Sequence, residues 1–94
     1  MGKAQYKVEG GKLVKAEITT KDNKIIKVKI TGDFFLHPEE IIDGLENAVE
    51  GAVLHEQVLT NRIRTFIKKS EAVLIGASPE DFAKCIVMAG AIDD

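Results

Sequence analysis

The sequence lacks most of the features that mark secreted and membrane proteins. It has one cysteine, Cys85, in 94 residues, and it has no tryptophan. A single thiol cannot close a disulfide within the chain, which excludes the disulfide scaffolds of small secreted domains and favours a reducing compartment. No apolar run approaches the roughly 20 residues that span a bilayer, and the lysine-bearing start has no signal-peptide core. We therefore expect a cytoplasmic protein with no membrane partner.

An excess of charge of one sign is also missing. Fifteen acids against 13 lysines and arginines give a net charge of −2, which excludes a strongly basic nucleic-acid binder. The charges are nevertheless separated along the chain. Residues 1–32 carry eight lysines and three acids, a net +5, whereas residues 33–94 carry five lysines and arginines and twelve acids, a net −7. A chain of this length, residues 1–94, is expected to form a single domain.

Period-two alternation of apolar and charged residues predicts three antiparallel strands within about residues 4–31. Gly10-Gly11 separates the first two strands and is expected to form a two-residue hairpin turn, because glycine adopts the positive φ values that such a turn needs. Asp22 and Asn23 tolerate left-handed conformations and supply the second turn. The buried face of this sheet is expected to hold Tyr6, Val8, Val14, Ala16, Ile18, Ile26, Val28 and Ile30.

After residue 32 the apolar residues recur at helical spacing. This spacing predicts helices over about 38–50, 56–69 and 79–91. Pro38 suits the first turn of the first helix, and Ser78 and Asp81 fit the N-cap and the capping-box position of the third. Residues 71–75 fit either a short fourth strand or an apolar connector. Strands followed by helices predict an α+β fold, with about three helices packed on one face of a three-stranded antiparallel sheet.

No arrangement of side chains points to catalysis or to a metal. Gly10-Gly11-Lys12 leads into a strand and not into a helix N-terminus, so it is not a phosphate cradle. His37 and His55 have no metal-ligand spacing, and we expect them to be turn or surface residues. Cys85 lies beside the apolar stripe of the third helix, where a buried thiol is expected instead of a reactive one. We assign no catalytic, cofactor-binding or metal-binding residue to this chain.

Lysines occupy the face of the predicted sheet opposite to the apolar set. Lys7, Lys15, Lys27 and Lys29 alternate outward there, together with Glu9 and Glu17. This surface fits either a solvated sheet face or a docking site for RNA or an acidic protein. No aromatic residue interleaves the lysines for base stacking, which argues against nucleic acid.

The segment 31–38 departs from both periodicities. It places two adjacent phenylalanines, Phe34 and Phe35, between the sheet and the first helix. Adjacent residues in extended chain point to opposite sides, so either one ring packs inward while the other meets a partner, or both close the end of the core. On the first alternative the segment forms a partner interface made by Gly32, Asp33, Phe34, Phe35 and His37.

In their order and spacing these segments resemble a known family. The glycine pair at 10–11, Gly32-Asp33-Phe34-Phe35 and Ser78-Pro79-Glu80-Asp81-Phe82 are similar to the C-terminal accessory domain of lipoate–protein ligases, over about residues 6–91. The family's large domain, with its glycine-rich lipoate-binding loop and its lysine that contacts lipoyl-adenylate, has no counterpart here. The chain therefore resembles the free-standing small subunit of a split, two-gene ligase.

The resemblance implies a non-catalytic subunit that forms a heterodimer with a catalytic large subunit. That complex would use ATP, lipoate and Mg²⁺ to form lipoyl-AMP, and would then transfer the lipoyl group to a lysine of lipoyl domains in 2-oxoacid dehydrogenases or of the glycine-cleavage carrier. The accessory domain is implied in the adenylation half and binds no cofactor alone. Two alternatives stay open: a sulfur-acceptor or iron–sulfur scaffold protein, which needs a reactive Cys85, and a small RNA- or protein-binding module that uses the lysine face.

Overall fold

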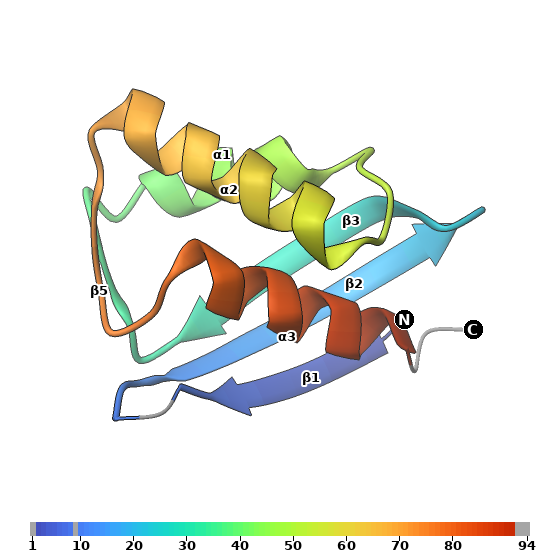
Figure 1. The fold of residues 1–94 in the computed structure, drawn as a ribbon, viewed down its shortest axis with the longest axis horizontal. Helices are drawn as coiled ribbons and strands as arrows, with labels where there is room; N and C mark the ends of the chain where they lie inside the picture. The colour runs from blue at the N-terminus through green and yellow to red at the C-terminus, as the bar shows by residue number, and fades with distance from the viewer. Residues whose placement is uncertain (1, 9, 92–94) are drawn as a thin grey trace.

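The computed structural model describes residues 2–8 and 10–91, and it has the α+β architecture that the sequence predicts (Figure 1). Its elements in chain order are β1 (Gly2–Lys7), β2 (Leu13–Lys21), β3 (Lys24–Gly32), β4 (Phe35–His37), α1 (Ile41–Val49), α2 (Glu56–Ser70), β5 (Val73–Ile75) and α3 (Pro79–Ala91). Strands β1, β2 and β3 form an antiparallel sheet in that order, and β4 pairs with β5 in a separate sheet.

The two hairpins of the large sheet differ in how closely they follow the sequence signals. The β2–β3 turn has Asp22 and Asn23 at φ values of 54° and 62°, as predicted. The β1–β2 connection is longer than the predicted two-residue turn. The N–H of Val8 donates to the carbonyl oxygen of Lys12 at 3.0 Å, and three residues separate these two. Residue 9 lies outside the described residues. Gly10 has the expected positive φ, 66°.

The predicted core of the large sheet is wrong at one position. The register pairs Thr19 with Lys27 and then Thr20 with Ile25, so Ile26 is an extra residue in β3. This bulge leaves Ile26 52% exposed and buries Ile25 instead. The other predicted core positions of β2 and β3 are buried: Val14, Ala16, Ile18, Val28 and Ile30.

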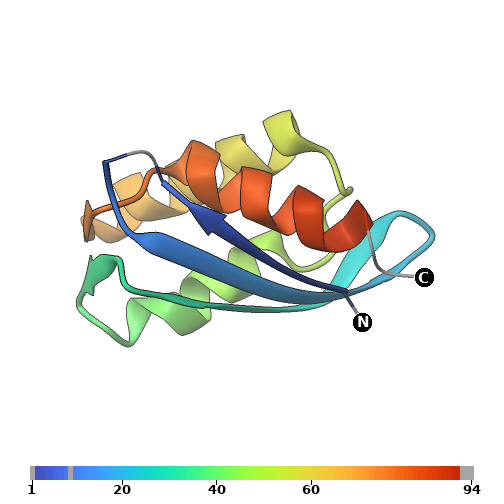
Figure 2. The same ribbon diagram turned by 90° about the horizontal axis from the view of Figure 1, so that it is seen from below.

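Helices cover one face of the large sheet. α3 packs on β1 and β2, α1 packs on β3, and α2 packs against both of these helices (Figures 1 and 2). The helices contribute their apolar stripes to the core, including Leu45, Leu59, Ile63, Phe82 and Ile86, which are fully buried. The opposite face of the sheet is solvent-exposed along the strands that the structure describes.

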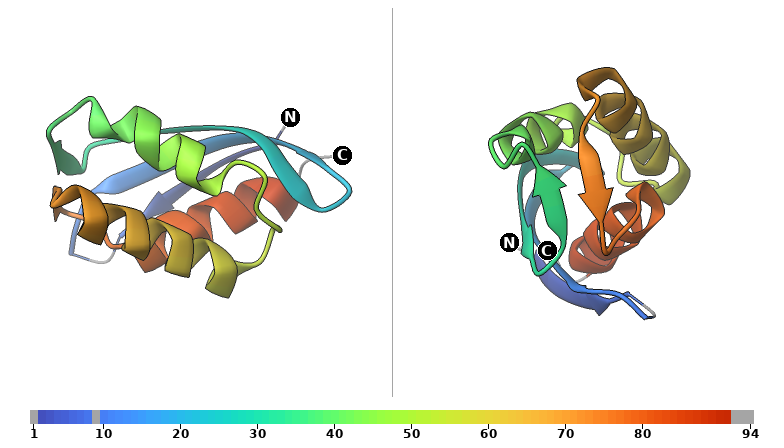
Figure 3. Two further views of the ribbon diagram at one scale, coloured as in Figure 1. Left: turned by 90° about the horizontal axis from the view of Figure 1, so that it is seen from above. Right: turned by 90° about the vertical axis from the view of Figure 1, so that its left-hand side faces the viewer.

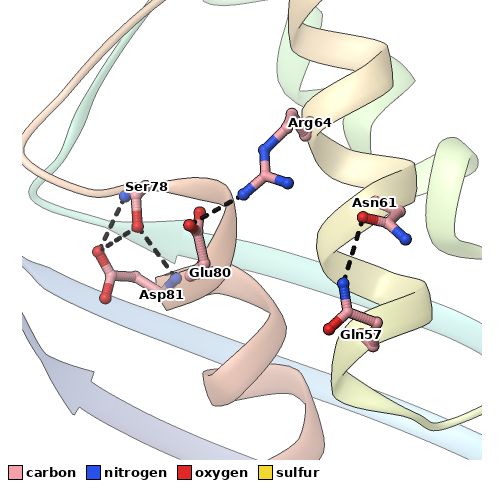
Figure 4. A network of polar contacts seen from close by, with 6 residues as sticks. All are labelled: Gln57, Asn61, Arg64, Ser78, Glu80 and Asp81. Carbon is pink, nitrogen blue, oxygen red and sulfur yellow. Dashed lines mark hydrogen bonds and ion pairs between the residues drawn. The ribbon is translucent and has the colours of Figure 1, made fainter.

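The start of α3 has the predicted capping box. The N–H and the hydroxyl of Ser78 both donate to Oδ2 of Asp81 at 2.9 Å, and the Asp81 N–H donates to Oγ of Ser78 at 3.3 Å (Figure 4). Arg64 of α2 forms an ion pair with Glu80 of α3 at 2.9 Å beside this box. The capping box therefore fixes where α3 begins.

Of the other two helices, α1 begins later than the sequence predicts, whereas α2 begins at Glu56, as predicted. α1 begins at Ile41 and not at 38, because the N–H groups of residues 41–43 bond to carbonyls three residues earlier, in a tight turn that starts at Pro38. α2 begins after His55, whose Nδ1 accepts the N–H of Gln57 at 3.2 Å. His55 is thus a helix cap as well as an exposed residue.

A second, smaller sheet lies at one end of the molecule (Figure 3). The segment 71–75, for which the sequence left a strand and a connector open, contains the strand β5. It pairs with β4 and not with the large sheet, so part of the predicted link between sheet and helix is itself a strand. The paired positions are Phe35 with Ile75, Leu36 with Leu74 and His37 with Val73.

Candidate partner interface

The predicted interface segment begins where β3 ends. Gly32 pairs with Val14 and has φ 152°, and a Cβ at this position would collide with the carbonyl oxygen of Leu13. The same carbonyl accepts the N–H of Asp33 at 2.9 Å. The start of the segment is therefore held closely against β2, and Asp33 itself is exposed.

The two phenylalanines point to opposite sides, as one of the two alternatives predicted. Phe34 is half-buried and meets the ring of Phe82 edge to face, with 4.9 Å between ring centroids and 81° between the planes. Phe35 is 52% exposed and stacks on the imidazole of His37, with 6.1 Å between centroids. Phe34 therefore belongs to the core, whereas Phe35 is free to contact a partner.

Phe35 is part of a larger apolar surface that sequence reasoning found only in part. In the register Phe35 lies opposite Ile75, and His37 lies opposite Val73, so all four side chains share one face of the small sheet. We call this surface, made by Phe35, His37, Val73 and Ile75, the end face. Ile75 is 59% exposed and Val73 is 46% exposed. The sequence shows the largely apolar segment 71–75, but which of its residues point outward depends on pairing with β4.

The reverse side of the small sheet fixes it to the molecule. Leu36 is buried in the core and Leu74 packs half-buried against it. A hollow of about 280 Å³ adjoins the end face, and its lining includes Gly32, Phe34 and Phe35. An exposed aromatic ring beside a hollow is a typical anchor point in protein interfaces.

The side chains considered for chemistry have structural explanations. Cys85 is fully buried, and its thiol donates to the carbonyl oxygens of Val14 at 3.5 Å and Ala4 at 3.6 Å. Burial raises the pKa of this thiol to about 11, so the reactive thiolate does not form near neutral pH. The sulfur-acceptor alternative, which needs a reactive Cys85, is therefore not supported.

Among residues 2–8 and 10–91, no three His, Cys, Asp or Glu side chains gather as metal ligands. No helix in the same residues is long and apolar enough to cross a bilayer.

Both the sequence and the structure of this chain are similar to those of known proteins. Residues 3–86 match the family model described as bacterial lipoate protein ligase C-terminus. The chain is 30% identical over 74 residues to lipoate-protein ligase A subunit 2 of Thermoplasma acidophilum, a match that covers 79% of this chain and 76% of that protein. It is also similar, with a TM-score of 0.75 and 30% identity, to a chain in a structural analysis of an archaeal lipoylation system, a bi-partite lipoate protein ligase and its E2 lipoyl domain from Thermoplasma acidophilum. This second match covers 89% of this chain and 91% of that one.

Proposed function

Because this chain belongs to the family of bacterial lipoate protein ligase C-terminal domains, we propose that it completes the activation of lipoate on a separate catalytic subunit. It is the non-catalytic subunit of a lipoate–protein ligase complex, and its partner is the large subunit. The complex forms lipoyl-AMP from lipoate and ATP with Mg²⁺, and then transfers the lipoyl group to a lysine of a lipoyl domain in a 2-oxoacid dehydrogenase or of the glycine-cleavage carrier. We assign lipoate, ATP and Mg²⁺ to the large subunit.

The end face is the observation that carries this role. Phe35, Val73 and Ile75 expose apolar side chains that the fold of the chain leaves uncovered. Contiguous exposed apolar residues on a folded domain are typical of a site for another protein. We assign the end face, together with Gly32, Asp33 and the adjoining hollow, to contact with the large subunit.

An accessory subunit can accelerate a reaction without donating a group to it. Adenylation requires the lipoate carboxylate and the α-phosphate of ATP to be held in line, in a site from which water is excluded. If the end face binds the large subunit best in that arrangement, each 1.4 kcal/mol or so of differential binding raises its population about tenfold. Transfer needs an open approach for a bulky lipoyl domain, so its maximal rate does not depend on the same arrangement.

A reconstituted reaction with two donors tests this role. With lipoate and ATP, the large subunit alone should form little lipoyl-AMP, and addition of this chain should restore pyrophosphate release. With ready-made lipoyl-AMP and a saturating acceptor domain, lipoylation should proceed at similar rates with and without the chain. Equal dependence on the chain for both donors would contradict the adenylation role and would mean that the chain only stabilises its partner.

Ile75→Asp tests the position of the contact, and Ile26→Asp is its matched control. Both isoleucines are more than half exposed, at 59% and 52%, but Ile26 lies near the β2–β3 turn, at the other end of the molecule from β5 (Figure 1). We expect Ile75→Asp to leave the chain folded and to lower its stimulation of pyrophosphate release at least tenfold. Ile26→Asp should retain the stimulation. Equal stimulation by both variants would exclude the end face as the contact.

A further inference from the structure

The exposed face of the large sheet is a second surface, and the proposed function does not use it. All three strands contribute lysines to it, and each of these lysines is exposed. We call this surface the basic face; it is made by Lys3, Lys7, Lys15, Lys27 and Lys29, with Gln5, Glu17 and Thr31 between them. Glu9, which the sequence also placed there, lies outside the described residues.

The lysines of the basic face are only partly neutralised by neighbouring side chains. Glu17 lies between Lys3 and Lys29 in the register, and it forms an ion pair with Lys3 at 3.2 Å. Lys15 lies between Gln5 and Thr31, neither of which is acidic. The residues opposite Lys7 and Lys27 are Leu13 and Thr19, which are also uncharged. Among the described residues of this face, five ammonium groups with one carboxylate give a positive field that attracts an acidic surface.

The basic face is hollowed and adjoins the proposed contact with the large subunit. A depression of about 420 Å³ is lined by Lys3, Gln5, Lys15, Glu17, Lys29 and Thr31, together with Ala4 and Ala16. Thr31 also lines the smaller hollow beside the end face. The two surfaces therefore meet where β3 ends, and a molecule docked on the basic face would lie next to the junction of the two subunits.

The two surfaces suit partners that stay bound for different times. The end face is apolar, as in interfaces that remain assembled, whereas exposed lysines give fast and salt-dependent association with ready release. An acceptor domain must arrive, be modified and leave in every turnover. Nucleic acid fits this face less well, because stacking needs aromatic rings, and Tyr6, the aromatic residue of β1, lies beneath Lys84 of α3, with 4.8 Å from Nζ to the ring centroid.

Resting on the proposed function, we propose that the basic face docks an acidic surface of the lipoyl acceptor domain and so holds the target lysine near the large subunit. The docking supplies affinity and a faster association rate, and no residue of the basic face takes part in the chemistry. It acts on the KM for the acceptor, whereas the end face acts on the formation of lipoyl-AMP. The two contributions are therefore measured separately.

The double variant Lys15→Glu with Lys27→Glu tests the proposal in the reconstituted complex. Neither lysine lies opposite an acid in the register, so the variant places no carboxylate directly across a strand pair from Glu17. Lys68→Glu with Lys69→Glu makes the same change in net charge at the end of α2, on the helical side of the molecule, and is the matched control. Thermal unfolding first establishes that both double variants fold.

The assay measures the KM for a lipoyl domain from the same organism, with ready-made lipoyl-AMP as donor. We expect the basic-face variant to raise this KM about tenfold or more at low salt, and the difference to shrink to about twofold at 0.5 M salt, because screening weakens exposed charges. The α2 variant should keep the wild-type KM. Replacing acidic residues of the acceptor domain by their amides should remove the difference between wild type and the basic-face variant.

Pyrophosphate release from lipoate and ATP, measured without acceptor, separates this proposal from the proposed function. The basic-face variant should release pyrophosphate at the wild-type rate. An unchanged KM in the folded variant would overturn the proposal, and so would a matching loss of pyrophosphate release, which would place the basic face against the large subunit. Failure of the proposed function has another signature, because the wild-type chain would then not stimulate pyrophosphate release at all.

Discussion

Phe34 and Phe35 are adjacent and chemically identical, yet truncation of each ring should have a different effect. Phe34 is half-buried and contacts Phe82 at 4.9 Å between centroids. Removal of a fully buried phenylalanine ring lowers the free energy of unfolding by about 3–5 kcal/mol, and an aromatic pair contributes about 0.5–1.5 kcal/mol. Because Phe34 is only half-buried, we expect Phe34→Ala to lower the free energy of unfolding by about 2 kcal/mol. In a domain of this size that lowers the Tm by roughly 8–16 °C.

Phe35→Ala should leave stability almost unchanged and weaken binding. The ring is 52% exposed, so its removal should change the free energy of unfolding by less than about 0.5 kcal/mol. An aromatic anchor at the centre of an interface contributes about 2 kcal/mol or more to binding, so the Kd for the large subunit should rise about 30-fold.

Two measurements separate the effects. Thermal unfolding of the two isolated variants reports the free energy of unfolding, and titration of the large subunit, at a temperature where both variants are folded, reports the Kd. The interpretation of Phe35 is refuted if Phe35→Ala lowers the Tm as much as Phe34→Ala does. It is equally refuted if Phe35→Ala binds the large subunit with wild-type affinity.

Cys85→Ser should retain ligation activity and lose about 1–2 kcal/mol of unfolding free energy in denaturant titration, because it buries a hydroxyl. Burial raises the thiol pKa from 9.0 to about 11, so the wild-type free energy of unfolding should fall by about 2 kcal/mol as pH rises from 9 to 11; a fall of the same size in Cys85→Ser would contradict this cause. Glu71→Gly should raise the free energy of unfolding by about 1 kcal/mol, since Glu71 has φ 54° and its carboxylate lies at the negative end of α2; no rise in Tm would argue against this strain. Gly32→Ala should lower the Tm, at a cost of about 2 kcal/mol, because the new Cβ meets the carbonyl oxygen of Leu13; Thr31→Ala beside it is the control and should melt within a few degrees of wild type.

The large sheet was predictable because a half-buried strand repeats its orientation at every second residue. The same rule fails at the bulge, where the phase shifts by one residue. Ile25 and Ile26 are chemically identical, so the local sequence does not reveal which of them is buried. The helix starts show a similar division: Ser78 and Asp81 are a local signal that the structure follows, whereas the tight turn after Pro38 delays α1.

The candidate interface was predictable only where the evidence is local. Opposite orientation of Phe34 and Phe35 follows from extended backbone, and the structure has it. The contribution of Val73 and Ile75 depends on pairing between β4 and β5, which are separated in the sequence by two helices. Strands of three residues are too short to show a period, so this pairing is decided by tertiary packing.

The small sheet has a consequence for how the chain fluctuates. Of the residues in β4 and β5, Leu36 is buried, Leu74 is half-buried and the other four are exposed, so little apolar burial opposes a local opening of this sheet. Segments of this kind open at a lower free energy than the whole domain unfolds. Their amide hydrogens therefore exchange with solvent ahead of those in β2, the central strand. A large subunit bound to the end face slows hydrogen exchange in β4 and β5 and leaves exchange in β2 unaffected. The surface that binds the partner therefore belongs to the segment whose local opening is reduced by binding.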